Sequence, residues 1–178
     1  MKHYLDIHGW FGYEKTYDFL IKSIPENGTF VECGAWLGKS SNYLCEIANK
    51  KNINVFIVDS WKGSQSELEN SHKMATEIDI FEVFKENMDG KKYTAIREYS
   101  LDACKRFENE SLDVVFIDME HTYKSVMQDI QAWLPKVKKN GYLAGHDYSD
   151  FWPEVKKAVV DKFEEFDIID DCWIHHKK

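Results

Sequence analysis

Short apolar segments alternate with amphipathic segments along the chain from residue 29 onward. The two strongest apolar segments, 54–59 and 112–118, each end in an aspartate, and a segment with helical periodicity follows the second. Strands that are buried on both faces and separated by helices pair in parallel through right-handed crossovers. The sequence therefore predicts an α/β fold with a doubly wound, mostly parallel sheet, helices on both of its faces and an antiparallel strand at the C-terminus.

Hydrophobic residues make up 43% of the 178 residues, which is enough for one continuous core. We therefore expect residues 1–178 to form a single domain with a helical lead-in at 1–28. The polar segment 63–76 has little periodicity and is the expected flap over a ligand site. The expected strands are 29–33, 54–59, 93–97, 112–118, 142–145 and one or two in the tail, and the expected helices are 13–24, 39–50, 77–88, 101–107, 122–134 and one that begins at 152–153.

Charge and cysteine content exclude several classes of function. The chain has 23 basic and 31 acidic residues and a net charge of −8, so it repels a phosphate backbone and nucleic acid is not an expected partner. No apolar run is long enough to span a bilayer, and the N-terminus has no apolar signal core. The cysteines form no C-x-x-C pair, which disfavours a zinc cage and fits reduced thiols in a cytoplasmic protein.

The turn after the segment 29–33 carries the pattern E-x-G-x-x-x-G. Three residues separate Gly34 from Gly38, one fewer than a P-loop needs, and the G-x-G-x-x-G dinucleotide pattern is absent. The glycines let a ligand approach the backbone, Glu32 can face an ammonium group, and Asp59 can accept hydrogen bonds from both ribose hydroxyls. This pattern favours an adenosyl ligand without phosphates, S-adenosylmethionine. A small P-loop-like ATPase stays open as an alternative because 112–118 resembles the acidic strand of such enzymes.

Carboxylates and imidazoles follow two later strands, at 118–121 and at 146–147. The carboxyl ends of neighbouring parallel strands meet at one edge of a sheet, so we expect Asp118, His121, His146 and Asp147 to converge. Two carboxylates with further polar ligands suit a divalent cation such as Mg²⁺. Attack of an alcohol on a sulfonium methyl group needs alkoxide character, which a bound cation and a nearby base supply.

Four separated motifs occur in the order known from one enzyme family. They are FVECGAWLGKSSNYL, VFIVDSWKGS, LDVVFIDMEHTYKSVMQDIQAWLPKVKKNGYLAGHDY and the terminal CWIHHK. They resemble the class I S-adenosylmethionine-dependent methyltransferases, and more narrowly the branch of the macrolide-sugar O-methyltransferases and methyltransferase domain 24 proteins. The resemblance runs from about Gly9 to the C-terminus. It implies a Rossmann-like fold and methyl transfer to a hydroxyl of a small molecule such as a sugar.

The same resemblance implies which residues bind the cofactor. Asp59 would hold the ribose, Ser60 and Trp61 would border the adenine, and Ser100 would lie near it. Asp118 could serve the ammonium group of the cofactor. The residues implied on the methionine side, together with Ala35 in the same turn, are Glu32, Gly34, Trp36, Gly38 and Ser40.

In the related enzymes, an acid follows the fourth strand and a pair of acids follows the fifth. His146 stands where the first acid of that pair is expected, so the implied metal ligands are Asp118, His146 and Asp147, and Mn²⁺ becomes a candidate beside Mg²⁺. In the catechol O-methyltransferases, which the chain resembles more distantly, a catalytic lysine follows the metal aspartate by three residues. The matching residue is His121, and an imidazole, with an ordinary pKa of about 6.5, suits a base near neutrality. We expect His121 to be the base, with His146 as second candidate, and expect His3, His72, His175 and His176 at the surface.

The expected function is therefore an S-adenosylmethionine-dependent O-methyltransferase with a small-molecule acceptor and an assisting divalent cation. The alternative from another class is a non-catalytic domain that binds the nucleoside cofactor as a sensor. The sequence leaves open the acceptor, the identity and need of the metal, and assembly into a homo-oligomer.

Overall fold

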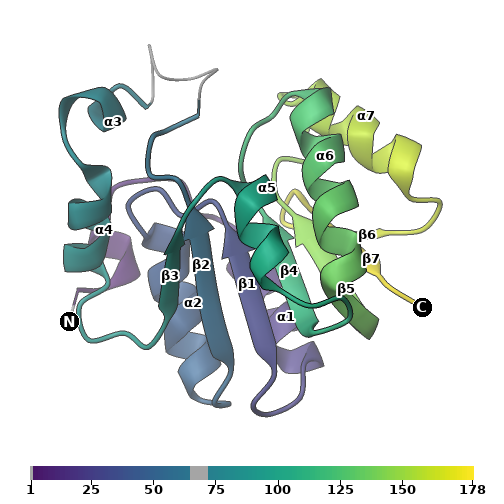
Figure 1. Ribbon diagram of the computed structural model, residues 1–178, viewed down its shortest axis with the longest axis horizontal. Helices are drawn as coiled ribbons and strands as arrows, with labels where there is room; N and C mark the ends of the chain where they lie inside the picture. Colours follow the sequence, from purple (N-terminus) through teal and green to yellow (C-terminus); the bar gives the residue numbers. More distant parts are fainter. Residues whose placement is uncertain (1, 65–71) are drawn as a thin grey trace.

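The computed structural model describes residues 2–64 and 72–178 and contains one twisted sheet with the strand order β3-β2-β1-β4-β5-β7-β6 (Figure 1). Strands β1 to β5 are parallel to one another, and β7 runs antiparallel between β5 and β6. The predicted mostly parallel sheet with an antiparallel C-terminal strand is confirmed. The strands are β1 Thr29–Cys33, β2 Asn54–Asp59, β3 Thr94–Arg97, β4 Leu112–Ile117, β5 Val137–Gly145, β6 Asp167–Ile169 and β7 Cys172–His176.

Helices cover both faces of the sheet, as the periodicity predicts (Figure 1). Helices α1, α2 and α4 bury side chains with Phe30 and Phe116 on one face, and α5, α6 and α7 bury side chains with Val31 and Val115 on the other. The helices are α1 Glu14–Ser23, α2 Lys39–Asn49, α3 Met74–Glu77, α4 Ile80–Asn87, α5 Ser100–Ala103, α6 Tyr123–Trp133 and α7 Pro153–Lys162, with short 3-10 turns at Tyr4–Asp6, Cys104–Arg106 and Leu134–Lys136.

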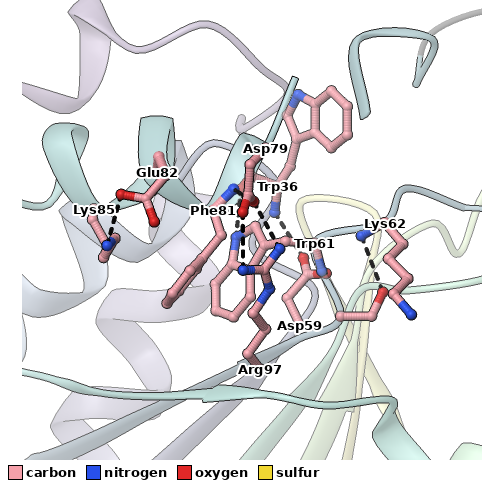
Figure 2. Close-up of polar contacts among 10 residues, drawn as sticks. Trp36, Asp59, Trp61, Lys62, Asp79, Phe81, Glu82, Lys85 and Arg97 are labelled. Atoms are coloured by element: carbon pink, nitrogen blue, oxygen red, sulfur yellow. Dashed lines mark hydrogen bonds and ion pairs between the residues drawn. The ribbon is translucent and has the colours of Figure 1, made fainter. Parts of the chain in front are cut away.

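The helix expected at 77–88 begins only at Ile80, as α4, because Ile78 is extended and Asp79 caps the helix, and Glu77 ends the separate short helix α3. The Asp79 carboxylate accepts a hydrogen bond from the Phe81 backbone N–H at 3.1 Å, which satisfies a free donor of the first turn. It also pairs with Arg97 at the end of β3 at 2.7 Å (Figure 2). This contact ties α4 to the edge of the sheet.

Of the flap expected at 63–76, residues 65–71 lie outside the described part of the chain. The remainder includes the first three residues of α3, Met74 to Thr76. In the described ranges 2–64 and 72–178, no helix has the length and apolar character that crossing a membrane requires.

The ends of β1 and β4 approach each other closely. The Asp118 backbone N–H donates to the Cys33 carbonyl at 2.7 Å, and the Gly34 N–H donates to the Val58 carbonyl at 2.9 Å. Gly34 has a φ of +94°, and a Cβ added to it would lie 1.6 Å from the Asp118 carbonyl oxygen. Only glycine fits at this position, which brings the turn after β1 against the end of β4.

Candidate active site

A cavity of about 550 Å³ opens at the carboxyl ends of the parallel strands, where ligands of doubly wound folds bind. The turn after β1 and the ends of β2, β4 and β5 all contribute to its wall. The residues predicted for the site that line it are Gly34, Ala35, Trp36, Ser40, Asp59, Ser60, Asp118, His121, His146 and Asp147.

Asp59 closes the glycine turn from the end of β2. One carboxylate oxygen, Oδ2, accepts hydrogen bonds from the backbone N–H groups of Ala35 and Trp36 at 2.8 and 3.0 Å. The other, Oδ1, accepts one from Trp61 at 2.7 Å, and Figure 2 shows Asp59 between Trp36 and Trp61. Burial raises the pKa of the Asp59 carboxyl, although these backbone donors act in the opposite direction. Each carboxylate oxygen has two lone pairs, so Oδ1 keeps the capacity to accept a further bond from a ligand.

The Trp36 indole lines the same cavity and stacks on His72 with ring centroids 4.4 Å apart. Its buried Nε1–H has no hydrogen-bond partner within residues 2–64 and 72–178. Buried donors are nearly always satisfied, so this donor is one to which a bound ligand can supply the acceptor. His72, expected at the surface, is half-buried and contributes to the cavity wall.

Two residues predicted near the adenine have side chains directed into the core. Trp61 is 2% exposed, packs on Phe81 and Phe84, and donates from Nε1 to the Trp36 carbonyl at 2.9 Å (Figure 2). Ser100 is buried at the start of α5, where its hydroxyl accepts a hydrogen bond from Trp133 Nε1 at 2.8 Å. Neither residue lines the cavity, and Trp61 instead holds the glycine turn in place.

Glu32 and Gly38 likewise lie outside the cavity wall. The Glu32 carboxylate is fully buried and accepts hydrogen bonds from the hydroxyls of Tyr17, at 2.7 Å, and Ser41. Burial raises the pKa of Glu32 to about 7, against the lowering effect of these two donors. Glu32 therefore joins β1 to α1 and α2 from inside the core.

This raised pKa predicts a pH-dependent stability. Because the folded-state pKa lies above the unfolded one, the stabilisation is complete below about pH 4.5 and is lost as the pH rises through about 7. Relative to Glu32→Gln, the wild type should lose up to about 3 kcal/mol of unfolding free energy between pH 4.5 and 8. Urea unfolding of both proteins across this range measures the difference, and the exposed Glu108→Gln serves as control. Parallel curves for wild type and Glu32→Gln would contradict the raised pKa.

Four polar side chains converge at the other end of the cavity, and we refer to Asp118, His121, His146 and Asp147 as the aspartate–histidine cluster. His121 Nε2 lies 2.8 Å from Asp147 Oδ2. His146 Nδ1 lies 3.6 Å from Asp118 Oδ1 and 3.3 Å from Asp147 Oδ1. The Tyr13 hydroxyl donates to Asp118 Oδ2 at 2.9 Å. The structure thus brings together the groups that follow β4 and β5 in the sequence.

Two groups of this cluster, His146 and Asp147, have strongly shifted pKa values. Burial lowers the pKa of the His146 imidazole, but the charge of Asp118 and hydrogen bonds to Asp118 and Asp147 outweigh it and raise the pKa to about 10. Burial raises the pKa of Asp147, yet hydrogen bonds from His121 and His146 lower it well below its usual range. An imidazolium at His146 beside the ionised carboxylate of Asp147 follows from these shifts.

Asp118, His121 and Asp147 each offer one ligand atom, and these atoms lie within 4.8 Å of one another. Two carboxylate oxygens and an imidazole nitrogen form a donor set that suits a divalent cation such as Mn²⁺. The residues present therefore fit a cation. This group contains His121 where the sequence resemblance implied His146, whose Nδ1 instead faces the Oδ1 atoms of both aspartates.

Several residues of the site do not follow from the sequence patterns. Tyr13 is expected there only as an apolar residue of the first helix, although a buried tyrosine usually has a partner for its hydroxyl. Lys39, at the start of α2, lines the cavity and donates from Nζ to the Gly9 carbonyl at 3.1 Å. Tyr99 and Trp10 also line it and are 51% and 56% exposed. Lys39 lies within the first motif but received no role from it, and Tyr99 and Trp10 lie outside the four motifs.

The doubly wound sheet, the glycine turn after β1 and the aspartate that ends β2 are the features expected of a class I S-adenosylmethionine-dependent methyltransferase domain. The chain belongs to the family described as methyltransferase domain, whose family model matches residues 31–148.

Known proteins similar to this chain include one curated relative and many solved structures. An uncharacterised protein of Acanthamoeba polyphaga mimivirus is 31% identical over 144 residues, which cover 75% of this chain and 60% of the relative. The O-methyltransferase NovP is 19% identical with a TM-score of 0.65, covering 93% of this chain and 79% of its own. A Podospora anserina methyltransferase solved with S-adenosylhomocysteine bound is 16% identical with a TM-score of 0.62, covering 92% and 77%.

Proposed function

We propose that the protein is a cytoplasmic O-methyltransferase that transfers the methyl group of S-adenosylmethionine to a hydroxyl of a small molecule such as a sugar, assisted by a divalent cation. One observation carries the proposal: a single cavity joins Asp59 and the glycine turn to the aspartate–histidine cluster. The family membership and the resemblance to NovP, an O-methyltransferase, support it. The free state of all four cysteines is consistent with a reducing compartment.

The end of the cavity at β1 and β2 would hold the cofactor. The Asp59 Oδ1 atom would accept from the ribose, and the Trp36 Nε1–H would donate to a ligand acceptor. Carboxylates in the same cavity, including Asp118, favour a ligand that carries a cationic sulfonium and ammonium. A triphosphate would meet the same carboxylates unfavourably, which argues against the ATPase alternative.

The cluster would perform the proton transfer. Asp147 contacts His121 Nε2, and the His121 ring stacks on Trp152 with centroids 3.8 Å apart, so its orientation is fixed. We assign His121 as the base that takes the acceptor hydroxyl proton, after which the oxygen attacks the methyl carbon and the sulfur leaves as a neutral thioether. Asp118 and Asp147 would hold the cation, which when bound lowers the pKa of a coordinated hydroxyl.

Exposed aromatic side chains at the mouth of the cavity support a small acceptor. Phe151 and Trp10 are 80% and 56% exposed, and both line the cavity. Such faces pack against the apolar face of a ring. With a net charge of −8, the protein disfavours nucleic acid as acceptor.

Asp59 provides the first test. Replacement by asparagine or alanine removes a charged acceptor, and hydrogen bonds to charged groups contribute about 1.5–3 kcal/mol. We expect S-adenosylhomocysteine affinity, measured by isothermal titration calorimetry, to fall by about 10–100-fold in both variants. Asp167→Asn, on the distant strand β6, should bind as the wild type does.

Other outcomes separate the alternatives. Thermal stabilisation by ATP with Mg²⁺, without any effect of S-adenosylhomocysteine, would favour the ATPase. Tight S-adenosylhomocysteine binding without product formation on a broad panel of hydroxylated compounds, with and without Mn²⁺, would favour the non-catalytic domain.

A further inference from the structure

Tyr13 reaches the site from outside the segment that matches the family model. It directly precedes α1, whereas the match begins at residue 31. Its side chain is 1% exposed, and its hydroxyl donates to Asp118 Oδ2 at 2.9 Å. Its ring packs against Phe116 of β4, with centroids 5.3 Å apart, and against His146, at 4.4 Å. Ring and hydroxyl together fix Tyr13 in a single position beside the cluster.

Helix α1 is itself anchored to the sheet, so this position is rigid. Tyr17, one turn further along, donates to Glu32 in the core, and the Thr16 hydroxyl donates to the Ile169 carbonyl at 2.8 Å. Tyr13 does not use its side chain to cap α1. Its hydroxyl donates a hydrogen bond to Asp118 instead.

The hydrogen bond determines which way the Asp118 carboxylate faces. It occupies one lone pair of Oδ2, while Oδ1 lies 3.6 Å from His146 Nδ1. Each carboxylate oxygen has a second lone pair for another partner. Asp118 belongs to the group whose ligand atoms lie within 4.8 Å of one another. Partners of this kind orient metal-binding side chains, and their loss usually costs about 10–100-fold in metal affinity.

We propose that Tyr13 is a positioning residue that orients Asp118 for cation binding, so that the N-terminal segment before the matched domain is part of the active site. This inference rests on the proposed cation site. Tyr13 acts through Asp118 and has no direct part in the methyl transfer.

Tyr13→Phe tests the inference, because it keeps the ring packing and removes only the hydroxyl. We expect Mn²⁺ affinity, measured by electron paramagnetic resonance of free Mn²⁺, to fall by about 10–100-fold, while S-adenosylhomocysteine affinity changes less than about twofold. Tyr17→Phe is the matched control. Tyr17, one turn further along, also donates a buried hydroxyl to a carboxylate, but this carboxylate belongs to Glu32, which lies outside the cluster. It should leave Mn²⁺ affinity within about twofold of the wild type. Near-UV circular dichroism of each variant verifies the native fold.

A double-mutant cycle with Asp118→Asn shows whether the effect passes through Asp118. In the Asp118→Asn background, Tyr13→Phe should cause little further loss of the residual Mn²⁺ affinity. Equal Mn²⁺ affinity in wild type and Tyr13→Phe, or an equal loss in Tyr17→Phe, would overturn the positioning role while leaving the proposed function intact. No Mn²⁺ binding by the wild type would overturn both the cation site and this inference, and retained S-adenosylhomocysteine binding would still support the methyltransferase.

Discussion

Replacing Gly34 by alanine should abolish cofactor binding and destabilise the fold by more than about 4 kcal/mol, a loss seen only for the most disruptive substitutions. The added Cβ would lie 1.6 Å from the Asp118 carbonyl oxygen and 2.6 Å from its carbon. Both atoms belong to the backbone and cannot move like the end of a side chain. The φ of +94° adds strain of its own for any residue with a Cβ. The turn after β1 and the end of β4 would have to separate.

Separation at this point would damage both ends of the cavity, because the turn holds Asp59 through Ala35 and Trp36 while Asp118 belongs to the cluster. Urea unfolding measures the stability, and calorimetry with S-adenosylhomocysteine measures the binding. Gly12→Ala is a matched control, since a Cβ there has no atom within 4 Å, and its stability should stay within about 0.5 kcal/mol of the wild type. A Gly34→Ala protein with native stability and affinity would show that the close approach of β1 and β4 is not needed.

The sheet follows from the sequence because buried strands and amphipathic helices leave strong periodic patterns. The segment 54–59 coincides with β2, and 29–33 coincides with β1. Helix α4 is one exception, since the residue that caps it, Asp79, is also the partner of Arg97 on β3. Strand β5 begins at Val137, before the expected 142, because the expected turn at Asn140 lies inside the strand. Asn140 has a φ of +63°, and the register between β5 and β4 is irregular.

The site was predictable where a polar residue directly follows a strand. Asp59, Asp118 and Asp147 end or follow strands, so the topology alone brings them to one edge of the sheet. Glu32 was harder to place because β1 is buried on both faces, and no alternation of polar and apolar residues shows which face a side chain occupies. In the structure Phe30 and Glu32 face α1 and α2, while Val31 and Cys33 face the other helical layer.

Partners that are distant in sequence account for the rest. Tyr13 meets Asp118 across 105 residues, and Ser100 meets Trp133 across 33. Composition and sequence spacing do not predict such pairs. The orientation of the Trp61 side chain is also not predictable from the sequence. An indole next to the glycine turn can face either the ligand or the aromatic side chains of α4, and in the structure it faces α4.

Removing the imidazole of His121 should slow methyl transfer by about 10²–10⁴-fold, the usual contribution of a positioned acid–base group. The acceptor is chosen as the hydroxylated compound that gives the fastest wild-type release of S-adenosylhomocysteine with Mn²⁺ present. In His121→Ala, the cavity and Asp59 remain, so S-adenosylhomocysteine affinity should stay within about twofold. Added imidazole should restore part of the rate, because the stacking position on Trp152 becomes vacant. The exposed His176→Ala serves as control and should turn over as the wild type does.

Metal affinity decides which role His121 has, because it also belongs to the group of possible ligands with Asp118 and Asp147. If His121 is the base, His121→Ala should bind Mn²⁺ within about threefold of the wild type, since the two carboxylates keep their oxygens. A fall of tenfold or more would make His121 a ligand and remove it as the base. Loss of S-adenosylhomocysteine binding in the folded variant would contradict both the base and the ligand role. His121 contacts Asp147 and Trp152, and neither contact involves the glycine turn that would hold the cofactor.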